Sequence, residues 1–211
     1  EETRQRNAEL ALINDVQRGL AEHLDAQAMY DLVGDRIQEI FDAQVVDIGI
    51  VDREDGLLHF PYAIERGERF PDEPGQIAGF GGLAMQTREP LLVNEDMAKK
   101  AAEVGSDVIQ GELPKSGLFV PLVVGGVATG RISLQNLDHE HAFTESDVRL
   151  LTTLAGSLSV ALENARLFEE TRQRAAELAI VNNVGQALAE QLDLDALIEA
   201  LGDQLREVFA A

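Results

Sequence analysis

The sequence has no cysteine, no tryptophan and only two tyrosines among its 211 residues. The absence of cysteine excludes disulfides, thiol nucleophiles, thiolate metal sites and thioether-linked chromophores. Aromatic residues make up 5% of the chain, so few side chains could stack on nucleic-acid bases. No apolar run reaches the roughly 18 residues of a membrane-spanning helix, and no signal peptide is recognisable.

Basic residues are also scarce, with 17 Lys and Arg against 38 Asp and Glu and a formal net charge of −21. A negative field of this size repels phosphate backbones and anionic membrane surfaces, so we expect neither nucleic acid nor membrane as a partner. Hydrophobic residues make up 45% of the chain, which is ordinary for a globular protein and argues against disorder. We therefore expect a soluble, cytoplasmic protein.

An internal repeat is present. The segment Glu1–Arg6 recurs as Glu169–Arg174, and 23 of the 43 positions in 1–43 are identical to those in 169–211. Solenoid units run roughly 20–50 residues, so an offset of 168 suits a whole domain instead. The predicted boundaries are an N-terminal connector helix at 1–25, one domain at 26–168, and the connector and first helix of a second, truncated copy at 169–211.

Periodicity along the chain predicts an α+β protein. Apolar residues three and four apart indicate helices over 3–23 and from Asp25 to about 41, and a long helix from Glu145 towards Gln191. Asn94 could cap another helix ending near 104, and a short helical stretch lies at 82–87. Apolar and β-branched runs bounded by turn signals predict an antiparallel sheet of about five strands, at 45–52, 57–65, 90–93, 118–124 and 127–136.

The segment from Phe143 to Val148 is explained by helix capping. Thr144 can cap the following helix, and Asp147 stands at the third helical position, from which an acidic side chain can bond back to the backbone N–H of the capping residue. Phe143 and Val148 would then form the hydrophobic staple. We therefore expect these residues to be structural.

Two further segments invite a ligand-binding reading. Asp138–His141 (DHEH) offers four potential metal ligands, but a metal site needs convergent ligands and a fixed second shell, so we expect a solvated loop and no metal. Gly79–Leu83 precedes the short helical stretch and could hold an anion on exposed amides. We favour a turn that lets the backbone pack close to the sheet.

The order of the elements resembles that of a GAF domain over nearly all of 26–168, with PLVVGG at 121–126, ISLQN at 132–136 and AFTESDVRLL at 142–151. The resemblance implies a GAF/PAS-like antiparallel sheet of five to six strands, with a helical bundle on one face, a small-ligand pocket on the other, and long opening and closing helices. It also implies a regulatory role in a multidomain signalling protein whose output domain lies outside this chain.

The sequence departs from three ligand-specific branches of that family. Cyclic-nucleotide-binding members carry an Asn-Lys pair, a Phe and an Asp-Glu pair, whereas Leu137 follows Asn136 here and Val148 follows Asp147. The free-methionine-sulfoxide reductases and the covalent bilin binders both need cysteine. We therefore expect none of these activities, and no motif names a cofactor.

Several side chains could enclose a small-molecule pocket with mostly apolar walls. The candidate residues are His59, Phe60, Tyr62, Phe80, Met85, Phe119, Ser133 and Gln135. The alternative is that they are core and edge residues of a spacer module without a ligand. No combination of nucleophile, base and orienting group stands out, so we expect no catalysis.

Alternating three- and four-residue steps along the last helix indicate a seam able to pair with another helix. We predict a homodimer through this helix and the first one, with the seam residues Leu10, Ile13, Leu20, Leu24, Leu151, Leu154, Leu158, Ala161, Ala165 and Phe168. Beyond Phe168 the apolar face resumes one residue out of phase, at Leu178 and Val181. The alternative is an ordinary helix packed on the sheet of its own domain.

Overall fold

A computed structural model of the chain describes residues 2–23, 25–71, 73–105 and 112–191, together with 198–199, 202–203 and 205–206. The chain divides into two compact units, Glu1–Ala165 and Arg166–Ala211, which are described separately. Leu24, one of the predicted seam residues, lies outside the described residues. No helix in the described part of the chain is long and apolar enough to cross a membrane.

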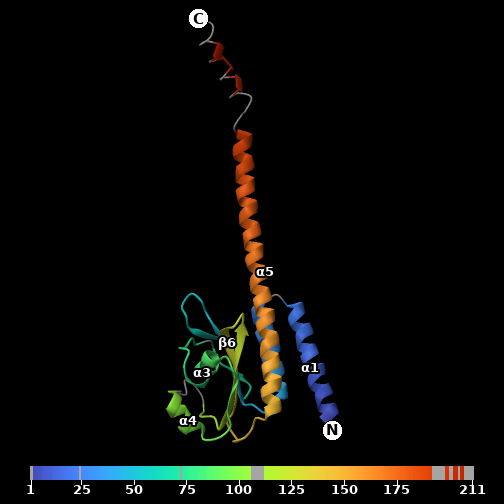
Figure 1. The fold of residues 1–211 in the computed structure, drawn as a ribbon, viewed down its shortest axis with the longest axis vertical. Coiled ribbons are helices and arrows are strands. Elements are labelled where there is room, and N and C mark those ends of the chain that lie inside the picture. Colours follow the sequence, from blue (N-terminus) through green and yellow to red (C-terminus); the bar gives the residue numbers. More distant parts are fainter. Residues whose placement is uncertain are drawn as a thin grey trace. The chain divides into compact units, whose positions relative to one another are not determined.

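The first unit is built on one six-stranded antiparallel sheet of order β3-β2-β1-β6-β5-β4 (Figure 1). The elements in chain order are α1 (Glu2–Glu22), α2 (Ala26–Ile40), β1 (Val45–Val51), β2 (Leu58–Glu65), β3 (Glu68–Arg69), α3 (Gly79–Thr87), β4 (Leu91–Val93), α4 (Met97–Val104), β5 (Ser116–Val124), β6 (Val127–Asn136) and α5 (Glu145–Gln191). The predicted α+β class and sheet are confirmed. Only β3 was not predicted from the sequence, since a strand of two residues has no detectable periodicity.

The sheet is assembled from two hairpins. β1 and β2 form one, and β5 and β6 form the other through Gly125 and Gly126, which adopt φ values of 57° and 82°. A two-residue turn of this kind requires positive φ at both positions, which glycine adopts without strain. The hairpins join where β1 pairs with β6, so the central strands are buried, and the edges consist of the short strands β3 and β4.

Helices α2 and the first part of α5 cover one face of the sheet, which we call the helical face (Figure 1). The cap of α2 is the predicted one, because the Asp25 carboxylate accepts hydrogen bonds from the backbone N–H groups of Gln27 and Ala28. Helix α5 begins with the predicted capping box. The Asp147 carboxylate accepts from the Thr144 N–H at 2.7 Å, and the Asp147 N–H donates to the Thr144 hydroxyl.

Most of the predicted dimer seam is the core of the domain itself. Leu151, Leu154 and Leu158 are at most 1% exposed and pack in the helical-face core with Leu20, so the alternative of a helix packed on its own sheet applies to them. Ile13, Ala161 and Ala165 are also packed against or within this core, whereas Leu10 and Phe168 are exposed. The predicted periodicity is present, but these residues pack against the sheet of their own domain. The same apolar stripe would be needed for packing on the sheet and for pairing with a second helix, so periodicity alone does not distinguish the two.

Helix α4 does not begin as predicted. Its N-cap is Asp96, in the left-handed conformation and without a side-chain cap hydrogen bond, rather than Asn94. The Asn94 side chain instead accepts from the Phe143 N–H at 3.3 Å and donates to the Phe143 carbonyl at 2.6 Å. This double hydrogen bond ties the β4–α4 connection to the segment before α5. The Asn94 side chain is therefore used for long-range hydrogen bonds to Phe143 instead of for capping the adjacent helix.

Candidate functional site

A cavity of about 210 Å³ lies on the other face of the sheet, which we call the pocket face, beneath α3 and α4. Four of the predicted pocket residues line it, namely Phe60, Phe80, Phe119 and Gln135. The remaining lining residues are Val45, Asp47, Ala63, Ile64, Glu65, Phe70, Pro71, Glu73, Ala78, Gly81, Met97, Ala101, Leu113, Pro114 and Arg131. The walls are thus mostly apolar with a few charged groups, as small-molecule sites require.

An ion pair lies within the cavity wall. Arg131 Nη1 donates to Asp47 Oδ1 at 2.5 Å, and the two side chains are only 13% and 11% exposed. The residues come from adjacent strands, since β1 pairs with β6 and Asp47 stands opposite Ser133, two residues from Arg131. Each charge compensates for the desolvation of the other, which allows both to remain in a largely apolar wall.

Arg131 also contacts the Phe60 ring and packs closely against Gly81 of α3. Its guanidinium carbon lies 5.4 Å from the centre of the Phe60 ring, in cation–π geometry. A Cβ added at Gly81 of α3 would lie 2.2 Å from Arg131 Nε, so a side chain at this position would displace Arg131 from the place that it occupies. Gly81 therefore serves close packing of α3 over the sheet. The sequence predicted a turn at Gly79–Leu83 ahead of the helix, whereas this segment forms the first residues of α3 itself.

Tyr62 and His59 do not line the cavity, and a β-bulge in β2 accounts for the position of Tyr62. Between the pairs Ile48–Tyr62 and Ile50–His59, β1 advances two residues and β2 advances three. The extra residue reverses the alternation of side chains, so Phe60 lines the cavity while Tyr62 packs in the helical-face core. The Tyr62 hydroxyl donates to Asp35 at 2.9 Å, and His59 lies 2.9 Å from Asp55 in the hairpin.

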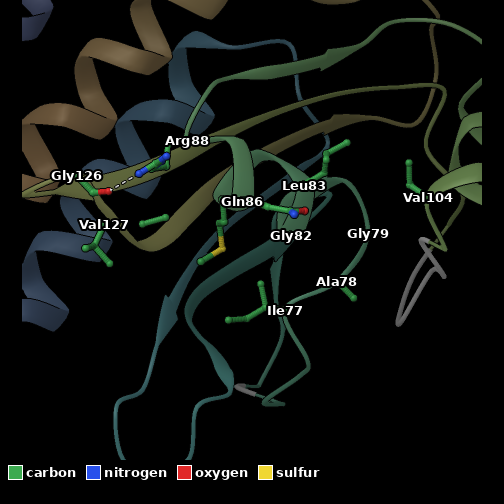
Figure 2. A pocket seen from close by; sticks show the side chains of 12 residues that line it. Ile77, Ala78, Gly79, Gly82, Leu83, Gln86, Arg88, Val104, Gly126 and Val127 are labelled. Carbon is green, nitrogen blue, oxygen red and sulfur yellow. Dashed lines mark hydrogen bonds between the residues drawn. The ribbon is translucent and has the colours of Figure 1, made fainter.

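Ser133 and Met85 also lie outside the cavity lining. Ser133 is fully buried on the pocket face and accepts a hydrogen bond from Gln135 Nε2 at 3.2 Å, so it positions a cavity residue instead of lining the space. Met85 lines a second hollow of about 780 Å³ between α3 and the β5–β6 hairpin. We call this hollow the groove; Figure 2 shows residues that line it and the hydrogen bond from Arg88 to the Gly126 carbonyl.

The smaller cavity is the better candidate site although the groove is larger. The groove exposes its lining to solvent, and its one charged side chain, Arg88, already donates to a backbone carbonyl at 3.1 Å. The cavity is more enclosed than the groove and contains several charged groups, which are the features that orient a bound ligand. Asp47 and Arg131 were missed in the sequence, although a lone charge of each sign in two otherwise apolar strands is a signal that could have revealed them.

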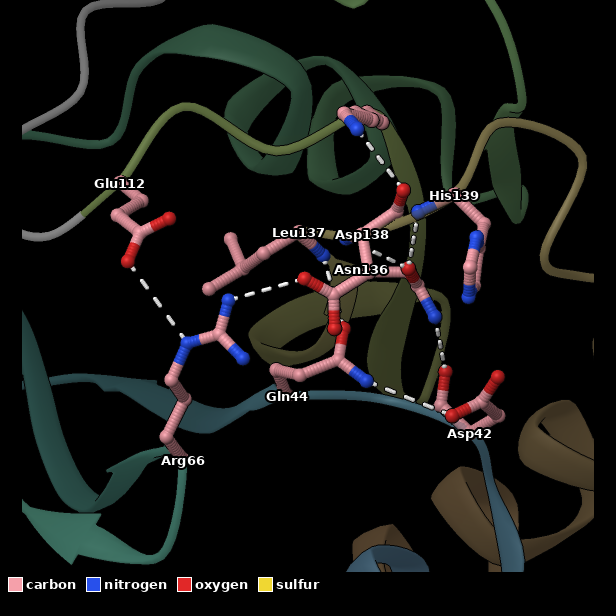
Figure 3. A network of polar contacts seen from close by, with 9 residues as sticks. Asp42, Gln44, Arg66, Glu112, Asn136, Leu137, Asp138 and His139 are labelled. Carbon is pink, nitrogen blue, oxygen red and sulfur yellow. Dashed lines mark hydrogen bonds and ion pairs between the residues drawn. The ribbon is translucent and has the colours of Figure 1, made fainter.

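Asn136, which matches the asparagine of the cyclic-nucleotide-binding members, has a structural function. Asn136 is fully buried, and its side chain donates to the Asp42 carbonyl at 2.7 Å and accepts from the N–H groups of Asp138 and His139 (Figure 3). Phe143 is 3% exposed in the helical-face core. With the capping role of Asp147, all three residues shared with that motif maintain the fold.

The Asp138–His141 segment is tied to its surroundings by several contacts. Asp138 accepts from Arg66 at 3.0 Å, and this hydrogen bond lowers the pKa of the Asp138 carboxyl below its usual value. The His139 carbonyl accepts from the Ser116 hydroxyl, and His141 lies 3.4 Å from Glu95. Among the described residues, no group of three or more histidine and acidic side chains converges as a metal site would require.

Comparison with known proteins identifies the family of this fold. The sequence model of the GAF domain matches residues 23–163. The circadian input-output histidine kinase CikA of Thermosynechococcus vestitus is 27% identical over 207 residues, which cover 89% of this chain. The chain spans only 28% of the length of that kinase.

Solved structures agree on the fold. The GAF domain from an Acinetobacter phosphoenolpyruvate-protein phosphotransferase superimposes with a TM-score of 0.60 and 17% identity, covering 77% of this chain and 98% of that one. A free methionine-R-sulfoxide reductase from Neisseria meningitidis, in complex with its substrate, gives a TM-score of 0.63 and 20% identity, covering 75% and 90%. At these identities the likeness establishes the architecture alone.

Proposed function

Because the chain belongs to the GAF domain family, we propose that it is a non-catalytic sensory module of a cytoplasmic, multidomain signalling protein, and that it binds a small molecule in the pocket-face cavity. The observation that carries this proposal is the partly enclosed cavity of about 210 Å³ with the Asp47–Arg131 pair in its wall. A non-catalytic role is supported by the absence of cysteine and by the mutual pairing of these two charges.

The size of the cavity limits the ligand. Its volume of about 210 Å³ is below the roughly 300 Å³ at which pockets for drug-sized molecules begin. A ligand of nucleotide or tetrapyrrole size would have to extend out of the cavity or displace α3 and α4. The cavity therefore favours a small metabolite.

Strand β6 supplies a route from the cavity to helix α5. Arg131 lines the cavity, while its neighbour Ile132 points to the opposite face and packs in the same core as Leu154. A ligand that displaced β6 by a fraction of an ångström would change the packing of α5, because close-packed cores do not deform continuously. Ligand binding would thus shift the population between two arrangements of α5.

A thermal-shift screen of small metabolites tests the proposal. At a concentration of about 100 Kd a ligand adds about 2.7 kcal/mol, which raises the Tm of a domain of this size by roughly 5–10 °C. Ala63→Leu should abolish the shift by filling the cavity, whereas Ala21→Leu, on the exposed side of α1, should retain it. The proposal fails if no compound raises the Tm, or if Ala63→Leu responds like the unaltered protein.

We also propose that the second unit contributes to a homodimer. Leu167, Leu178 and Val181 are 45%, 64% and 65% exposed and fall on one seam of three- and four-residue steps, which Thr171 and Arg174 interrupt. Such a stripe on a helix favours pairing with the same helix of a second copy. Light scattering at high micromolar concentration should give the dimer mass, and Leu178→Glu with Val181→Glu should give the monomer. A monomer mass for the unaltered protein would refute the pairing.

A further inference from the structure

The charged residues that line the cavity are predominantly acidic. Asp47, Glu65 and Glu73 stand against the single cation Arg131. Arg131 is paired with Asp47, and within the described part of the chain no ion pair involves Glu65 or Glu73. The cavity thus keeps two carboxylates in excess.

Aromatic rings form much of the remaining wall. Phe60, Phe70, Phe80 and Phe119 are four of the eight phenylalanines of the chain, and all of them line this one cavity. The rings of Phe80 and Phe119 lie 5.5 Å apart between their centres. The face of an aromatic ring carries negative partial charge, which attracts cations and repels anions.

The site already stabilises one cation by these two means. The Arg131 guanidinium lies over the Phe60 ring at 5.4 Å and is paired with the Asp47 carboxylate, while remaining 13% exposed. Ring faces and carboxylates in this wall therefore hold a largely desolvated positive charge. Three further rings line the cavity, together with the partly buried Glu65 and the exposed Glu73, so aromatic and acidic groups remain for a ligand.

We propose, resting on the proposed sensory function, that the cavity binds a small organic cation such as an alkylammonium compound. The ammonium group would lie against the phenylalanine rings, with Glu65 and Glu73 supplying the opposing charge. The net charge of −21 supports this assignment, because the field of the whole chain attracts cations and repels anions. The cavity volume of about 210 Å³ suits a compact cation.

An isosteric series isolates the contribution of charge. Calorimetric titrations would compare choline with neohexyl alcohol, which has carbon in place of the ammonium nitrogen, and with the anion tert-butylacetate. We expect choline to bind at least about tenfold more tightly than the alcohol, since a desolvated cation–π contact is worth that factor or more. Tert-butylacetate should not bind. Equal affinity for choline and the alcohol, preference for the anion, or binding of none of the three would overturn the proposal.

Variants link the preference to the cavity wall. Glu65→Gln combined with Glu73→Gln should weaken choline binding by about fivefold or more and leave the alcohol unchanged, because only the charge is removed. Phe119→Leu should likewise reduce the preference for choline. Glu54→Gln, in the exposed β1–β2 hairpin, is the matched control and should bind choline normally. A preference for choline that survives in the double variant contradicts the assignment of the two carboxylates.

The two proposals can fail separately. If the metabolite screen yields a ligand that requires an unfilled Ala63 cavity but is neutral or anionic, the sensory function stands and the cation assignment is overturned. If no compound stabilises the protein at all, both proposals fail.

Discussion

The two faces of the sheet differ although the same strands build both. On the helical face Tyr62, Ile37 and Leu154 are at most 1% exposed, and one continuous core joins the sheet to α1, α2 and α5. On the pocket face a small apolar cluster around Phe80 and Phe119 adjoins a cavity whose wall contains an ion pair. One face is closely packed, and the other retains a cavity with charged groups in its wall.

The lengths of the covering helices explain the difference. Helix α2 has 15 residues and α5 covers its face from the first turn onward, whereas α3 and α4 have nine and eight residues. Short helices joined by irregular segments cannot fill the whole face of a six-stranded sheet.

Both tyrosines contact the helical-face core, and burial raises the pKa of Tyr30 to about 12 and that of Tyr62 above its usual value.

The largest difference should appear on truncating a buried side chain on each face. Leu154→Ala should lower the free energy of unfolding by about 2–5 kcal/mol, because it leaves a hole in a closed core. Met97→Ala should cost only about 1–2 kcal/mol, since Met97 already borders the cavity and lacks neighbours on one side. Urea denaturation measures both, and equal losses would contradict the contrast between the faces.

Adding a methyl group tests the packing more finely. A Cβ at Gly34 of α2 would lie 2.4–2.5 Å from the Tyr62 ring, so Gly34→Ala should destabilise the domain by about 1–3 kcal/mol. The control is Gly156 of α5, where nothing lies within 4 Å of the added carbon. Gly156→Ala should stabilise by about 0.5–1 kcal/mol through helix propensity. If Gly34→Ala were as stable as Gly156→Ala in urea, the core would be looser than the structure indicates.

The smallest effect concerns the helix caps of the two faces. Thr144→Ala should cost about 1 kcal/mol, because Thr144 and Asp147 form a reciprocal cap at the start of α5. Asp96→Gly at the start of α4 should change stability by no more than about 0.5 kcal/mol, since Asp96 makes no cap hydrogen bond and adopts φ 52°. Thermal melting of both variants provides the comparison. A larger loss for Asp96→Gly would show that α4 depends on its cap.

The sequence predicted the elements better than it predicted the site. Helix α5 and β6 were predicted with their observed bounds, because long periodic runs carry their own signal. Half of the predicted pocket residues line the cavity, whereas Tyr62 does not, because a bulge in the pairing of two strands is invisible in one strand alone. The Asp47–Arg131 pair was missed because it joins residues 84 positions apart.

The sequence by itself determined the α+β class, the hairpins and the absence of thiol chemistry, because these depend on local periodicity, turn residues and composition. Only the tertiary structure decided which side chains share the cavity and that the leucines of α5 pack on the sheet of their own domain. The reason is that register, bulges and the choice of packing partner arise between segments far apart in the chain. The ion pair in the pocket wall belongs to this second class, and with it the chemistry on which ligand binding would depend.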